Sequence, residues 1–129
     1  MRSHLEFRAP ALVDAPTEDV PAGQRVAELL AAELPRHGYR VTDVHSEDWG
    51  WRVAIANAAF PLWIGCGHYE EYADGHLCFI EPSRPYLRRW LKRVATSEVV
   101  EGLAGALEGI LHDRASDLRW WTEAEVRRG

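Results

Sequence analysis

The chain has 129 residues, a formal net charge of −5 and an apolar fraction of 47%. This length and composition fit one globular domain spanning residues 1–129. An acidic chain repels nucleic acid and anionic membranes unless its positive charge is segregated, so we expect neither as a partner. The basic residues that do cluster have helical spacing, and we interpret them as a solvated helix face. They are Arg84, Arg88, Arg89, Lys92 and Arg93.

The lack of a recognisable targeting signal and the small number of cysteines favour a cytoplasmic location. The first ten residues alternate charged and apolar side chains and lack the continuous apolar stretch of a signal peptide. No segment approaches the ~18 consecutive apolar residues of a membrane-spanning helix. The two cysteines, Cys66 and Cys78, are too few for the disulfide framework of a small secreted domain. We therefore expect a cytoplasmic protein with both thiols reduced, and no motif predicts a cofactor.

The first third of the chain is predicted to contain a strand, a loop and a helix. Residues 4–8 alternate polar and apolar side chains, which is typical of a half-buried strand. A proline-rich loop follows over residues 9–21. Apolar residues at helical spacing then predict a helix over about residues 22–37, with Gly38 as its C-terminal cap.

The middle of the chain predicts an antiparallel meander. Asp74 and Gly75 form the dipeptide that a two-residue hairpin turn prefers. This turn would place Glu71 opposite Cys78 and keep Cys66 well away from Cys78. The strands that the pattern predicts cover residues 39–44, 49–55, 62–67 and 77–81.

The last third is predicted to be mainly helical. Apolar residues at helical spacing predict a short amphipathic helix over residues 85–94, with Trp90 on its apolar face. A second helix begins at Thr96 or Ser97, and a final strand before Thr122 leads into one helical turn. These elements predict an α+β fold in two layers. We expect an antiparallel sheet of four to six strands with two or three helices mainly on one face.

The residues that could bind a metal or act as a nucleophile lie around Cys66 and Cys78. If Cys66 faced Cys78 and His68 faced His76, the four side chains would form a zinc-type ligand set. The hairpin turn argues against this register, so no metal is expected. Catalysis by Cys66 is disfavoured because neighbouring carboxylates raise a thiol's pKa, and both cysteines are interpreted as small buried apolar residues.

Carboxylates and aromatic residues mark the best candidate for a binding surface. Two acidic groups flank the predicted strands and indicate either a solvated acidic rim or a partner-binding surface with aromatic anchors. The residues that we assign to this surface are Glu47, Asp48, Glu70, Glu71, Tyr72, Asp74 and Trp121. We expect Trp49, Trp51 and Trp63 to point into the core. Adjacent Trp120 and Trp121 cannot both point inward from a strand.

Several segments together resemble a group of small hypothetical bacterial α+β proteins. They are Glu47-Asp48-Trp49-Gly50-Trp51, Leu62-Trp63-Ile64-Gly65-Cys66-Gly67, Tyr69-Glu70-Glu71-Tyr72, Phe79-Ile80-Glu81-Pro82 and Arg119-Trp120-Trp121-Thr122. The resemblance covers roughly residues 49–126. It implies no established activity, and no functional residue is transferred from it.

Three functions follow as hypotheses. The first is a non-enzymatic cytosolic binding protein, and by analogy with other small acidic bacterial domains its concrete form is an immunity protein that neutralises a basic toxin domain. The second is a small enzyme or ligand-binding domain that uses the cysteine, histidine and glutamate residues of positions 66–78. The third is a subunit whose exposed tryptophans serve homo-oligomerisation.

Overall fold

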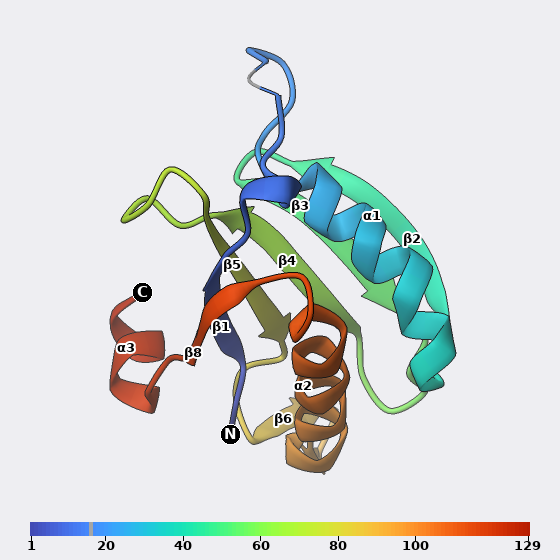
Figure 1. Ribbon diagram of the computed structural model, residues 1–129. Helices are drawn as coiled ribbons and strands as arrows, with labels where there is room; N and C mark the ends of the chain where they lie inside the picture. The colour runs from blue at the N-terminus through green and yellow to red at the C-terminus, as the bar shows by residue number, and fades with distance from the viewer. Residues whose placement is uncertain (16) are drawn as a thin grey trace.

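Six strands form one antiparallel sheet in this computed structural model, which describes residues 1–15 and 17–129 (Figure 1). The strands are β1 (His4–Arg8), β2 (Val41–Glu47), β3 (Gly50–Ile55), β4 (Leu62–His68), β5 (Gly75–Glu81) and β8 (Ser116–Trp120). Their order is β2-β3-β4-β5-β1-β8. The meander from β2 to β5 is therefore extended by the first and last strands of the chain. The predicted α+β fold is confirmed.

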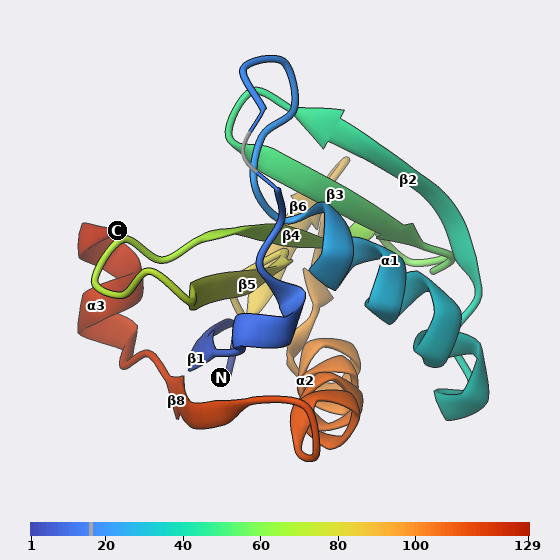
Figure 2. The same cartoon turned by 45° about the horizontal axis from the view of Figure 1, so that its top comes forward.

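Two helices, α1 (Gln24–Glu33) and α2 (Ser97–Leu111), cover one face of this sheet (Figure 2). A 3-10 turn, η2 (Leu34–His37), extends α1, and Gly38 ends it in the left-handed conformation at φ +88°, as predicted. A second short turn, η1 (Pro10–Leu12), follows β1, and α3 (Glu123–Arg128) lies near the chain end. Within the described residues, no helix combines the length and apolarity needed to cross a membrane.

The core lies between the sheet and the two covering helices. Alternate residues of the strands point toward the helices, and Leu5, Ile64 and Ile80 are fully buried there. Leu30 of α1 and Leu107 of α2 close the core from the other side. The opposite side of the sheet, here called the open face, has neither α1 nor α2 over it. It presents His4, Glu6, Arg52, Trp63, Leu77 and Phe79.

The predicted Asp74-Gly75 turn is wrong. Residues 69–74 form a longer loop and Gly75 begins β5, so that Cys66 pairs with Cys78 and His68 with His76. The two registers differ by an odd number of residues, and such a slip moves every side chain to the other face of the sheet. The observed register keeps apolar residues together on the buried face, whereas the expected one placed Glu71 there. Burial of the strand side chains therefore outweighs the turn preference.

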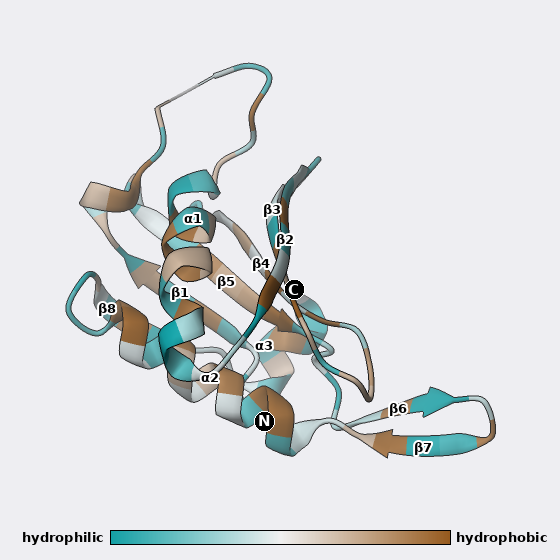
Figure 3. Ribbon diagram, turned by 90° about the vertical axis from the view of Figure 1, so that its right-hand side faces the viewer, coloured by the Kyte–Doolittle hydropathy of each residue, from teal (hydrophilic) through white to brown (hydrophobic). Residues whose placement is uncertain are grey.

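The helix predicted over residues 85–94 is also wrong. This segment forms a second, two-stranded sheet, β6 (Tyr86–Arg89) and β7 (Lys92–Ala95), that projects from the body of the molecule (Figure 3). Leu87 lies opposite Val94, and both are half-buried against the core. The amide of Thr96 donates to the Pro85 carbonyl at 2.9 Å and holds the base of the hairpin together. Short apolar runs satisfy the helix and the strand period equally well, which explains the error.

Candidate functional site

Three separate segments bring carboxylates to one end of the sheet. Trp51 pairs with Cys66 and Cys66 pairs with Cys78, so the β2–β3 turn and the β4–β5 loop lie at the same end. The segment 17–22 joins them and forms with the turn a recess of about 620 Å³. We call this region the acidic end. Its carboxylates are Glu18, Asp19, Glu47, Asp48, Glu70, Glu71 and Asp74.

The carboxylates of the acidic end differ in their partners. Asp74 accepts a hydrogen bond from Nε of Arg8 at 3.0 Å. Glu47 accepts one from Nε2 of His45 at 2.8 Å, and this bond with Glu47, together with one to a second carboxylate, raises the pKa of His45. Glu70 and Glu71 are exposed, and no ion pair reaches them within the part of the chain that the structure describes. These two are available to an incoming positive charge.

An aromatic hollow of about 370 Å³ opens on the open face beside the acidic end. Trp49, from the β2–β3 turn, lies 5.9 Å from the ring centre of Trp63 and 5.2 Å from that of Phe79. Trp49 is 46% exposed. The expectation that Trp49 and Trp63 point into the core is therefore wrong. Trp63 faces away from the core because Leu62 and Ile64 take the inward positions of β4, and Trp49 lies in the turn outside the strands.

Two glycines of β4 shape this hollow. A Cβ atom at Gly65 would lie 2.2 Å from Cζ of Phe79, so the phenyl ring lies directly against the strand backbone. At Gly67 an added Cβ would meet only the Trp49 carbonyl oxygen at 3.5 Å, an ordinary contact. Gly67 lines the hollow, and the missing side chain leaves room on its floor.

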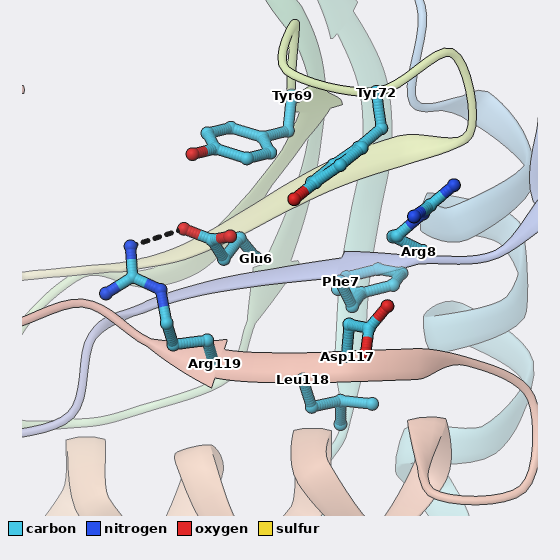
Figure 4. A pocket seen from close by; sticks show the side chains of 8 residues that line it. All are labelled: Glu6, Phe7, Arg8, Tyr69, Tyr72, Asp117, Leu118 and Arg119. Carbon is cyan, nitrogen blue, oxygen red and sulfur yellow. Dashed lines mark hydrogen bonds and ion pairs between the residues drawn. The ribbon is translucent and has the colours of Figure 1, made fainter.

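A second recess, of about 440 Å³, lies under the β4–β5 loop (Figure 4). Tyr69 and Tyr72 lean from the loop over β1, toward Glu6 and Arg8. The Arg8 guanidinium lies 4.3 Å from the ring centre of Tyr72, which is 43% exposed. Glu6 accepts a hydrogen bond from Nη2 of Arg119 at 2.6 Å. Loss of solvation and the negative charge of Glu6 raise the pKa of Tyr69.

Trp121 lies apart from the other residues assigned to the binding surface. Its ring is half-buried and stacks on His4 at 5.3 Å, and its Nε1 donates to Glu6 at 3.0 Å. Trp120 packs against the core and Trp121, just after β8, does not, in agreement with the expectation that the two cannot both point inward. Trp121 thus supports the recess through its bond to Glu6, whereas Trp49 and Tyr72 are exposed at the acidic end.

Sequence reasoning missed Glu6, Glu18, Asp19 and Tyr69. The outward position of Glu6 in the alternating strand 4–8 was the one usable signal. The other residues lie in loops, whose spatial neighbours no local pattern reveals.

The register brings Cys66 beside Cys78 and His68 beside His76, but His68 is exposed and only the other three side chains are buried. The Sγ atoms of Cys66 and Cys78 lie 4.0 Å apart, and both are fully buried free thiols. Contact with Cys78 and burial hold the pKa of Cys66 well above its usual value, which opposes a nucleophilic thiolate. Nε2–H of His76 donates to the Ala9 carbonyl oxygen at 3.0 Å. Among the described residues, no group of three or more histidine, cysteine, aspartate or glutamate side chains could hold a metal ion.

No protein-family model matches this chain, and no curated protein or solved structure compared with it matches either.

Proposed function

We propose that this chain is a non-enzymatic cytosolic binding protein whose acidic end takes the basic surface of a protein partner. Neutralisation of a basic toxin domain, as an immunity protein does, is the concrete form of this function. The observation that carries the proposal is the gathering of carboxylates from three segments at one end of the sheet, beside an aromatic hollow.

The two parts of this surface have different roles in binding. Exposed carboxylates such as Glu70 and Glu71 attract a positive surface over several ångströms and speed its approach. Exposed aromatic side chains such as Trp49 and Tyr72 supply the apolar area that keeps a complex together once it forms. A rim of charge around an aromatic centre is the arrangement found in protein interfaces.

A small enzyme or ligand-binding domain built on residues 66–78 has less support. The Cys66 and Cys78 side chains have no exposed surface. The ring of His76 is stacked on Phe7 at 5.2 Å and its Nε2 is occupied by a backbone carbonyl. These side chains stabilise the core beneath the acidic end, and a substrate would have to displace packed strands to reach them.

The test uses the basic protein encoded by a gene adjacent to that of this chain. Glu70→Lys combined with Glu71→Lys is expected to slow association by about tenfold or more at low salt and to leave dissociation nearly unchanged. The matched control is Glu28→Lys with Asp113→Lys, which makes the same change of net charge at an exposed position of α1 and at an exposed position of the turn after α2. Trp49→Ala is expected to speed dissociation by about 30-fold, since central aromatic anchors contribute about 2 kcal/mol.

Stopped-flow kinetics at two salt concentrations measures these rates. Co-expression provides the functional readout, because cells that make the toxin survive only when the acidic end is intact. Equal association rates for the Glu70/Glu71 variant and its control would contradict the proposal. So would cell death in the presence of the soluble wild-type chain.

A further inference from the structure

The β6–β7 hairpin, with the residues at its base (residues 84–95), is here called the arm, and it ends in two bulky apolar side chains. Trp90 and Leu91 form the two-residue turn at its tip and are 94% and 93% exposed. Trp90 takes φ +58°, a conformation that is rare for a bulky residue and that clusters at functional sites. An isolated two-stranded hairpin is marginally stable in water, so contact with another surface would stabilise it.

The arm carries a large share of the chain's positive charge. Five of the 15 cationic side chains lie between positions 84 and 93, and none of the 20 carboxylates does. All five are exposed. Without this segment the formal charge of the remaining residues falls from −5 to −10. The positive charge is thus segregated on a projecting element, in contrast to the solvated helix face expected from the sequence.

The acidic end has the complementary properties. The aromatic hollow, lined by Trp49, Trp63 and Phe79, has about 370 Å³ of space, near the lower end of the roughly 300–1,000 Å³ range of ligand pockets. One large apolar side chain suits this volume. Asp48 precedes Trp49 in the β2–β3 turn, and the exposed Glu70 lies two residues after His68, which also lines the hollow. Carboxylates therefore border an apolar depression, where the arm has cations behind an apolar tip.

We infer that this chain associates with a second copy of itself, with the arm tip of one copy seated in the aromatic hollow of the other. The β4–β5 loop precedes β5 and the arm follows it, so the loop of the acidic end and the arm lie at opposite ends of this strand. The arm projects away from the body of the molecule (Figure 3). A contact between two different surfaces is heterologous and can repeat from copy to copy. The contact is small, which predicts reversible association that weakens with salt.

Anionic lipid and nucleic acid are the other occupants that a basic arm could attract. The acidic end repels both, whereas in a second copy it attracts the arm. In the self-association, the chain itself provides both contacting surfaces, the arm tip and the aromatic hollow. This inference does not depend on the toxin partner, and its test contains only the purified chain.

Analytical ultracentrifugation of the full chain tests the contact. At about 20 mM salt, the average mass of the wild type should rise as its concentration increases from about 10 to about 500 µM, and about 500 mM salt should suppress the rise. Trp90→Ser with Leu91→Ser should weaken association by about 30-fold or more. Val13→Ser is the control, because Val13 is also an exposed apolar residue.

A second variant blocks the hollow without disturbing the core. Gly67→Lys adds a side chain to the floor of the hollow, where a Cβ atom meets only an ordinary contact, and it should abolish association. Gly105→Lys adds the same charge at a helix position with no atom within 4 Å of the new Cβ, and it should associate like the wild type.

Mixing the two defective variants gives the sharpest result. The tip variant keeps its hollow and the Gly67→Lys variant keeps its tip, so each should remain monomeric alone while the mixture forms a 1:1 complex. A monomeric wild type at every concentration would overturn the inference. It would also be overturned if the tip variant associated as strongly as the wild type, or if the mixture stayed monomeric. A chain that stays monomeric and whose arm binds anionic vesicles or DNA would overturn it as well.

Discussion

The ring of Phe79 lies against the backbone of Gly65, and this contact determines the shape of the aromatic hollow. In Gly65→Ala the new Cβ would lie 2.2 Å from Cζ of Phe79. Carbon atoms in contact are about 3.5–4.0 Å apart, so the ring must move by about 1.5 Å. It is held by His4 at 5.5 Å, Trp49 at 5.2 Å and Trp63 at 5.6 Å between ring centres.

The cost of this movement follows from two effects. Overpacking a well-filled site costs about 1–3 kcal/mol. Each aromatic pair that is disturbed contributes about 0.5–1.5 kcal/mol beyond its buried area. Alanine also lowers the conformational entropy of the unfolded chain, which stabilises the folded state by less than about 1 kcal/mol. We expect Gly65→Ala to lower the free energy of unfolding by about 2–3 kcal/mol, out of the ~5–15 kcal/mol typical of folded domains.

Urea denaturation followed by tryptophan fluorescence measures this change. Gly105→Ala is the matched control, since its Cβ meets no atom within 4 Å and alanine favours a helix by about 1 kcal/mol. Combining Gly65→Ala with Phe79→Leu should cost at least about 1 kcal/mol less than the sum of the two changes, because the smaller side chain leaves room for Cβ. A loss under about 0.5 kcal/mol for Gly65→Ala, or strict additivity in the pair, would refute the reasoning.

Three further predictions concern the arm, the edge strand and the buried thiols. Trp90→Gly should raise the melting temperature slightly, because glycine takes φ +58° without strain. Hydrogen bonds with Glu47 and a second carboxylate raise the pKa of His45 above 6.5. The stability that His45 contributes is therefore complete below about pH 6.5 and is lost as the pH rises through the pKa of the folded state. Glu47→Gln should lower this pKa in an NMR titration. Cys66 and Cys78 should react with a thiol reagent only after unfolding, and rapid labelling of the native chain would contradict their burial.

Local sequence patterns were sufficient to predict most of the helices and strands. The alternation in residues 4–8, the helical spacing before Gly38 and the Thr122 cap each report a structure whose cause lies within a few residues of the chain. The side chain of Thr122 accepts from the Glu125 amide and the Glu125 side chain accepts from the Thr122 amide. Such signals depend little on tertiary packing.

Register and the arm depend on packing and could not be predicted in this way. The preference of Asp74-Gly75 for a tight turn is a local signal, but the pairing of Ile64 with Ile80 on a fully buried face outweighs it. In isolation, the apolar spacing of residues 85–94 fits a helix as well as it fits a pair of strands. Since α1 and α2 occupy the covered face of the sheet, the segment instead projects as a hairpin, anchored by Leu87 and Val94.

The same dependence on tertiary structure explains which residues of the acidic end the sequence could indicate. Carboxylates near strand ends were visible as runs in the sequence, but the addition of Glu18 and Asp19 required the segment 17–22 to meet the β2–β3 turn. The exposure of Trp49 follows from its position in that turn, outside the strand where it was expected. The charge pattern thus indicated most carboxylates of the acidic end, whereas the hydrophobic pattern placed Trp49 in the core.

The distribution of charge links the two proposals. A net charge of −5 suggests a mildly acidic protein that repels every anion, yet it is the sum of a basic arm and a body at −10. An acidic end that attracts the basic surface of a partner must also attract the arm of another copy, because both surfaces are positively charged. If both proposals hold, the partner and the second copy compete for the aromatic hollow, and a tight partner would dissociate the assembly by mass action. Self-association would then cover the apolar tip and the hollow until the partner binds.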